Sequence, residues 1–239
     1  MELQQRAVLT QELTELHENI LRMGSMVDAA IEKAMAALDN RDVIMAREVV
    51  VGDEAINQLR YRIEEDALRI LATQQPIARD LRNVIASIHF AVELERIGDH
   101  AAGIARLVER LENEDAFDTL FKLPKMAQRA RTMVQISVQA YVEENVELAH
   151  TVMSKDDKID KQYRKLYRGA LQQMQDIEYI RRATFLLWIG HNLERIGDRA
   201  LNLAERVIFM ATSEFVENLD DLDDIDDFLS AEDPPTQTA

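Results

Sequence analysis

The sequence Glu95-Arg96-Ile97-Gly98-Asp99 occurs a second time, 99 residues later, as Glu194-Arg195-Ile196-Gly197-Asp198. Each copy is followed by a histidine or an arginine and then by an alanine. A repeat of about 100 residues is too long for a solenoid unit and indicates duplicated domains. The chain therefore builds the same structural feature twice.

The duplication extends beyond this motif. At an offset of 103, the set Asp53, Glu54, Ile56 and Asn57 aligns with Asp156, Asp157, Ile159 and Asp160. The motif itself aligns at an offset of 99, so the two halves differ by four residues in length at the turn formed by residues 73–76.

Apolar residues return every three or four positions along most of the chain, which predicts amphipathic helices. Only seven glycines and four prolines occur in 239 residues, which also favours long helices. Six helices are expected at residues 3–40, 42–72, 76–111, 124–143, 146–174 and 177–210, with Pro76 at the first helical position of the third. Because the turns between them are short, neighbouring helices must run antiparallel. The expected fold is all-α, with two tandem antiparallel three-helix bundles related by internal duplication.

The domain boundaries follow from this pattern. Residues 1–112 are expected to form the first bundle, 113–123 a linker, 124–213 the second bundle and 214–239 an acidic tail. The tail contains ten acidic residues and no lysine or arginine, which favours a disordered segment. Its acids alternate with leucine, isoleucine and phenylalanine, so an amphipathic segment that docks on a partner or on the protein's own body is the alternative.

Composition and charge limit the function. The formal net charge is −16, and an acidic surface repels phosphate backbones, so no direct nucleic-acid partner is expected. Cysteine is absent, which excludes disulfides and thiolate ligands. No apolar run is long enough for a bilayer, and the N-terminus lacks the order of a signal peptide. A soluble cytoplasmic protein is expected, one that touches membranes only through membrane proteins.

The carboxylates of the repeated motif occupy an unusual position on their helices. On a helical wheel, Glu95 and Asp99 lie about 100–140° from the core residue Leu94, in a direction that is otherwise apolar. Two carboxylates at positions i and i+4 repel each other, and partial burial increases the repulsion unless a cation or a proton resolves it. A hard metal ion suits such oxygen ligands.

The candidate metal ligands are the carboxylates of the two motifs and the aligned polar residues of each preceding helix: Asp53, Asn57, Glu95, Asp99, Asp156, Asp160, Glu194 and Asp198. An amide replaces one carboxylate at Asn57, so the first site should bind a metal ion more weakly or hold different metal ions. Iron, manganese, magnesium and zinc are the candidate ions.

Two other interpretations of the motif use no metal. The acids could form salt bridges with Arg96, Arg195 or Arg199, or the motif could simply pack helices together. Gly98 and Gly197 each cost helix stability of about 1 kcal/mol relative to alanine. A neighbouring helix or a ligand is therefore expected to approach the backbone at both glycines.

The chain resembles the PhoU family. The resemblance rests on Asp-x-x-Ile-(Asn/Asp) in each second helix, on Glu-Arg-Ile-Gly-Asp in each third helix, and on Pro76-Ile77-Ala78-Arg79-Asp80-Leu81-Arg82. It covers about residues 1–212 and leaves out the acidic tail.

The resemblance implies a cytoplasmic, often dimeric regulator that restrains the phosphate-starvation response when phosphate is plentiful. Its implied partners are the ATPase of the phosphate ABC transporter and a sensor histidine kinase, and it is not an enzyme. It also implies metal clusters on the carboxylates named above. The aligned pair Arg82 and Arg181 is a further candidate for binding a partner or phosphate. The alternative function is a carboxylate-bridged metal-dependent hydrolase or oxidase on a helical bundle.

Overall fold

Six α-helices make up most of the computed structural model, which describes residues 2–111 and 123–216. They are α1 (Glu2–Asn40), α2 (Val43–Gln74), α3 (Ala78–Leu111), α4 (Leu123–Glu143), α5 (Val146–Gln173) and α6 (Ile180–Thr212). The described ranges contain no strand, and the expected all-α fold is confirmed. Among these helices, none has an apolar stretch that could cross a bilayer.

Matching capping residues begin the second helix of each half. The Met45 amide donates to Asp42 Oδ1 at 2.9 Å, and the Leu148 amide donates to Asn145 Oδ1 at 3.1 Å. A side-chain oxygen at this position satisfies one of the amides that the first helical turn leaves without a partner. Asp42 and Asn145 differ by the same offset of 103 as the aligned residues further along these helices.

The third helix of each half starts later than the sequence predicted. Pro76 was expected at the first helical position, but α3 begins at Ala78. Gln75 ends α2 in the left-handed conformation, with φ of 48°, and Ala78 also has a positive φ of 47°. Pro76 therefore lies in the connection between the helices. Similarly, α6 begins at Ile180 rather than at residue 177, because turns occupy the preceding residues.

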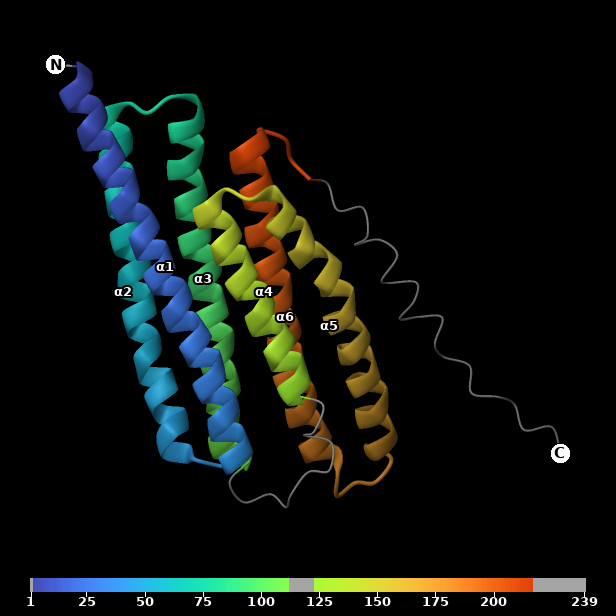
Figure 1. Ribbon diagram of the computed structural model, residues 1–239. Helices are drawn as coiled ribbons and strands as arrows, with labels where there is room; N and C mark the ends of the chain where they lie inside the picture. The colour runs from blue at the N-terminus through green and yellow to red at the C-terminus, as the bar shows by residue number, and fades with distance from the viewer. Residues whose placement is uncertain (1, 112–122, 217–239) are drawn as a thin grey trace.

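The helices form two antiparallel three-helix halves that lie side by side (Figure 1). Helices α3 and α6 pack against each other between the halves, and α1 packs against α4. One continuous hydrophobic core runs through both halves. The expected linker lies almost entirely outside the described residues, as does the tail beyond residue 216.

Polar contacts between α3 and α6 show a pseudo-twofold relation between the halves. Glu93 on α3 contacts Arg199 at 3.5 Å, while Asn192 Oδ1 on α6 accepts from His100 Nδ1 at 3.0 Å. At the offset of 99 that aligns the two halves, Asn192 corresponds to Glu93 and Arg199 corresponds to His100. The same two positions therefore meet twice, once as an ion pair and once as an amide–imidazole contact.

The α1–α4 seam is held by polar contacts of a different kind. Arg131 donates to both carboxylate oxygens of Asp28, at 2.8 and 2.9 Å. Between α3 and α4, the hydroxyls of Ser87 and Tyr141 lie 2.6 Å apart, and both side chains are buried. A buried hydroxyl needs such a partner, so this pair fixes α4 against α3.

Candidate metal centre

The two copies of the repeated motif occupy equivalent places. Glu95 and Asp99 lie on α3 beside α2, which carries Asp53 and Asn57, and the corresponding residues of the second half lie on α6 and α5. Each candidate centre is thus built from two adjacent helices of one half.

The glycine of each motif lets the neighbouring helix approach closely. A Cβ placed on Gly98 would lie 3.1 Å from Asp53 Oδ1 and 3.1 Å from Ile56 Cδ1. A Cβ on Gly197 would lie 3.5 Å from Asp156 Oδ1 and 3.1 Å from Ile159 Cδ1. The expected close approach to the backbone is therefore made by α2 in the first half and by α5 in the second.

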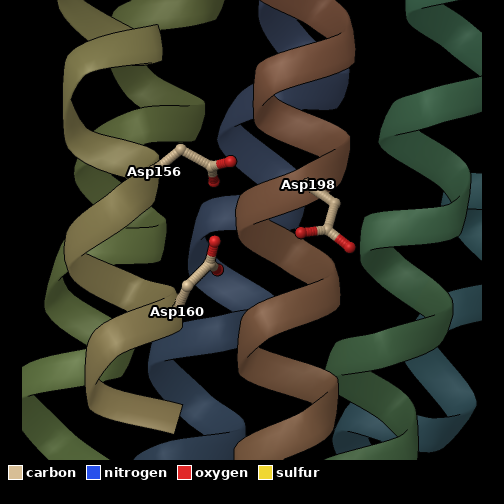
Figure 2. A group of neighbouring side chains, drawn as sticks. All are labelled: Asp156, Asp160 and Asp198. Carbon is tan, nitrogen blue, oxygen red and sulfur yellow. The ribbon is translucent and has the colours of Figure 1, made fainter. Parts of the chain in front are cut away.

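In the second half, three carboxylates converge between α5 and α6. Asp156, Asp160 and Asp198 each offer one oxygen, and these three atoms lie within 4.8 Å of one another (Figure 2). Asp156 and Asp160 project from α5 toward α6, which carries Asp198 (Figure 2). All three side chains are half-buried.

Asp156 is the most perturbed member of this group. Its Oδ1 is buried and accepts no hydrogen bond within the described structure. Burial, followed by the charges of Asp160 and Asp198, raises the pKa of the Asp156 carboxyl to about 7. A carboxylate in this position is destabilised by desolvation and by like charge, and a cation would relieve both effects.

Arg195 neutralises part of the second centre. Its Nε lies 3.2 Å from Glu194, and its Nη1 lies 3.0 Å from Asp198. His191 Nδ1 lies 3.3 Å from Glu194, but burial, followed by the charge of Arg195, lowers the pKa of His191 and so disfavours a charged ring. The salt-bridge interpretation is therefore correct for Arg195, although one guanidinium serves two carboxylates. Arg199 instead pairs with Glu93 across the α3–α6 contact.

His191 is a neighbour of the centre that the sequence analysis did not select. His191 precedes Glu194 by three residues on the same helix, and this spacing places both side chains on one face. The spacing could have identified His191 from the sequence.

The first half brings fewer acidic side chains together. Asp53 is buried, its Oδ1 accepts no hydrogen bond among the described residues, and burial followed by the charge of Asp99 raises the pKa of its carboxyl. Burial also raises the pKa of Glu95, which lies 3.8 Å from Arg60. Within residues 2–111, however, no three acidic or histidine ligand atoms come as close together as in the second half.

Asn57 accounts for this difference. It supplies an amide where the second half has a carboxylate, and its buried Oδ1 accepts no hydrogen bond from the described residues. Asp99 is exposed, whereas partial burial was expected, but its charge still acts on the Asp53 carboxyl of α2.

The two candidate binding arginines lie elsewhere. Arg82 Nε donates to the Met210 carbonyl at 2.9 Å and so ties the start of α3 to the end of α6. Arg181 is exposed, and its guanidinium lies 5.6 Å from the centre of the Phe185 ring. Neither residue joins the acidic groups, and their role in binding a partner or phosphate stays a prediction.

The donor chemistry of the second centre fits a hard cation. Asp156, Asp160 and Asp198 supply only oxygen atoms, which are the ligands that magnesium, manganese and iron accept readily. The buried Asp156 Oδ1, which accepts no hydrogen bond in the described structure, also fits a positive partner. In the first half, the Oδ1 atoms of Asp53 and Asn57 are likewise buried without a hydrogen bond, with one carboxylate fewer.

A duplicated helical bundle with an acidic centre in each half defines the class of this protein. The family model that matches is the PhoU domain, which fits residues 20–108 and again residues 123–207. The chain belongs to the PhoU domain family, and the two matches confirm the internal duplication.

Named relatives and solved structures agree with this assignment. A phosphate-specific transport system accessory protein PhoU homolog of Clostridium acetobutylicum is 36% identical over 214 residues, covering 89% of this chain and 98% of that protein. A homolog of the same name from Xylella fastidiosa is 36% identical, covering 85% of this chain and 86% of that protein.

The crystal structure of PhoU from Pseudomonas aeruginosa superposes with a TM-score of 0.82 at 33% identity, covering 86% of this chain and 99% of that one. The crystal structure of the phosphate transport system regulatory protein PhoU from Streptococcus pneumoniae superposes with a TM-score of 0.83 at 33% identity, covering 88% of this chain and 100% of that one.

Proposed function

We propose that this protein regulates phosphate uptake and phosphate-starvation signalling at the cytoplasmic side of the membrane, and that it restrains the response when phosphate is plentiful. It acts by contact with the ATPase of the phosphate ABC transporter and with a sensor histidine kinase. The names of its relatives, as accessory and regulatory proteins of phosphate transport, support this role.

The proposed regulator is a binding protein rather than an enzyme, and it works as a homodimer. The observation that carries the proposal is the convergence of Asp156, Asp160 and Asp198 in a PhoU-domain chain. A metal ion held there, with Glu194 beside it, would fix α5 against α6 and so set the shape of the surface that the partners meet. The first centre, with Asp53, Asn57, Glu95 and Asp99, would hold an ion more weakly.

A metal ion in this role supplies charge neutralisation and rigidity. The acidic residues fix the two helices relative to the ion: Asp156 and Asp160 orient α5, and Asp198 and Glu194 orient α6. Arg195 balances the remaining negative charge of Glu194 and Asp198. Metal content of the purified protein, measured by elemental analysis without chelators, tests this part of the proposal independently of any partner.

The regulatory role is tested by co-purification with the transporter ATPase and with the kinase from cells grown at high and at low phosphate. We expect capture of both partners, with a yield that depends on phosphate. The variant Asp156→Asn should reduce capture, and Asp157→Asn, an exposed neighbour on the same helix, should not. Absence of both partners under both conditions contradicts the proposal, whereas light scattering checks the dimer separately.

A metal-dependent hydrolase is the second candidate function. The convergence of Asp156, Asp160 and Asp198 favours it, because a metal ion held by these oxygens would act as a Lewis acid toward a phosphate ester. This function requires turnover of a phosphate ester by the metal-loaded protein and its loss in Glu194→Ala. If the metal-loaded protein shows no such turnover, the regulatory role stands alone.

A further inference from the structure

Helix α5 carries a concentration of positive charge in an acidic protein. Between residues 155 and 168 it has six basic and three acidic residues, a net charge of +3, whereas the whole chain has a net charge of −16. The corresponding part of α2, residues 52–65, has two basic and four acidic residues, a net charge of −2. Because the two halves share one fold, the bundle itself does not require basic residues on this helix.

Four of the basic side chains form a continuous stripe on the outer face of α5. Lys158, Lys161, Lys165 and Arg168 are exposed, and on a helical wheel they lie within about 80° of one another and at least about 100° from the buried Ile159. Within residues 2–111 and 123–216, none of the four forms an ion pair. We call these four residues the basic stripe, which extends over about 15 Å of the helix.

The basic stripe borders α4, on the side of α5 that is turned away from the candidate metal centre. Arg129 Nη1 on α4 donates to the Lys158 carbonyl at 3.3 Å, and the exposed Lys125 lies one turn earlier on that helix. Asp156 and Asp160 instead project toward α6 (Figure 2). The stripe and the metal centre are therefore separate features of α5, and α4 adds positive charge to the stripe.

Exposed apolar side chains lie where α5 ends and the chain turns into α6. Ile177 is 83% exposed, Leu171 is 46% exposed and Tyr179 is 42% exposed. The Arg182 guanidinium lies 5.4 Å from the centre of the Tyr179 ring. Residues 168–182 contain three arginines and two acids, so this end of the helix pair has no net negative charge.

An anionic membrane surface is the partner that matches both features. Lipid phosphates attract clustered lysine and arginine side chains, and apolar side chains on a protruding turn enter the headgroup region. Helix α5 packs against α4 and α6 and lies at the edge of the molecule, where a flat surface can reach the whole stripe (Figure 1). Charges are screened beyond about 8 Å at physiological ionic strength, so the acidic remainder of the protein opposes this contact only weakly.

We propose that the basic stripe and the α5–α6 connection bind directly to an anionic phospholipid surface. In this contact α5 lies along the membrane, and Ile177 and Tyr179 enter the headgroup region. Direct binding to lipid goes beyond the contacts with membrane proteins in the proposed function, and it depends neither on a metal ion nor on either protein partner. It raises the effective concentration of the protein beside a membrane-bound transporter.

Vesicle sedimentation with the full-length protein tests the proposal. At about 0.15 M salt, vesicles of phosphatidylglycerol and phosphatidylethanolamine should bind the protein at least about tenfold more tightly than vesicles of phosphatidylcholine, and high salt should release it. Lys161→Gln combined with Lys165→Gln should weaken binding to the anionic vesicles at least about tenfold. Arg22→Gln combined with Arg62→Gln is the control, because both arginines are exposed in the first half and the net charge changes equally.

A second pair of variants tests the apolar part of the contact. Ile177→Gln should weaken binding several-fold, whereas Ile77→Gln should not, although Ile77 in the α2–α3 connection is 77% exposed. Circular dichroism checks that all variants remain helical. The proposal is overturned if the anionic vesicles do not bind the protein, or if test and control variants bind equally. It is also overturned if the stripe variant binds vesicles normally but loses capture of a protein partner, since the stripe would then be a protein-binding site.

Discussion

Asp53 on α2 lies against the backbone of Gly98 on α3, and its Oδ1 is 3.1 Å from the position that a Cβ on that glycine would take. Asp156 and Gly197 repeat the relationship in the second half at 3.5 Å. The repeated motif therefore combines two functions. Its acids face the neighbouring helix, and its glycine lets the neighbouring helix bring a further acid close to them.

The first prediction concerns Gly98→Ala. Alanine normally stabilises a helix interior by about 1 kcal/mol relative to glycine, but here the new methyl would meet both Asp53 and the buried Ile56. We expect the substitution to lose this gain and to destabilise the protein by about 1–2 kcal/mol, as overpacking usually does. Gly52→Ala on α2 is the control, since nothing lies within 4 Å of its Cβ position. Urea unfolding measures both, and equal stabilisation by the two substitutions would refute the packing argument.

The second prediction concerns metal affinity. Asp156→Asn removes one oxygen charge from the three converging carboxylates, so Mn²⁺ or Mg²⁺ should bind at least about tenfold more weakly. Isothermal titration calorimetry on chelator-treated protein measures the affinity. Asp157→Asn keeps the same net charge as the test variant and leaves the centre intact, so it should bind as the unchanged protein does. If both variants bind equally, long-range charge and not the centre attracts the ion.

The third prediction concerns the pH dependence of metal-free protein. The pKa of Asp156 is raised from 3.8 to about 7, so the folded state holds a proton that the unfolded state has released. The stabilisation by this protonated carboxyl is complete below about pH 4 and is lost as the pH rises through 7. Asp156→Asn, which cannot ionise, should therefore gain stability relative to the unchanged protein between these values.

Because Asp156 is only half-buried, water screens the effect, and a relative gain of about 1–2 kcal/mol is expected. Urea unfolding at pH 5 and pH 8 in the presence of a chelator measures it. A stability difference between the two proteins that does not change with pH would contradict the assignment. Saturating Mn²⁺ should reverse the order of stability at pH 8, because the ion favours the charged carboxylate.

The fourth prediction concerns His17 on α1. Its Nε2 is buried and accepts or donates no hydrogen bond in the described structure, and its ring packs edge-on against Tyr141 with centres 5.0 Å apart. Burial lowers the pKa of His17 below its ordinary 6.5, although the charge of Glu144 opposes this shift. On acidification the unfolded state therefore takes up its proton first, and stability falls as the pH drops below about 6.5.

His17→Phe removes this titration while it keeps an aromatic ring against Tyr141. Its stability should fall less between pH 7.5 and pH 5 than that of the unchanged protein, as measured by thermal unfolding. The control is His150→Gln, because His150 is exposed on α5. An identical loss of stability in His17→Phe and in the unchanged protein would show that other groups cause the acid sensitivity.

Most of the fold could be predicted from the sequence because helices depend on local periodicity. The expected ranges agree with the six observed helices to within a few residues, and the aligned motifs identified the duplication. The exceptions lie at helix ends, such as the start of α3 at Ala78. There the left-handed conformation of Gln75, which no periodic pattern reveals, decided the boundary.

The composition of the two acidic centres could also be predicted, because Asp53, Asp156 and the motif acids were brought together by the alignment of the halves. Their geometry could not. Asp156, Asp160 and Asp198 come together because α5 packs against α6, and a meeting of side chains from two helices depends on tertiary packing. Helical spacing also does not predict that Asp99 is exposed while Asp198, at the same place in its motif, is half-buried.

The sequence by itself determined six amphipathic helices, their pairing into two related halves, and the acids that each half presents, since these properties follow from the spacing of residues along a helix. The tertiary structure alone decided which atoms meet. It placed Glu93 on Arg199 but Asn192 on His100, shared Arg195 between Glu194 and Asp198, and turned Phe215 back onto Phe209. Such contacts join residues far apart in the chain, and only the packing of whole helices, driven by burial of their apolar faces, fixes them.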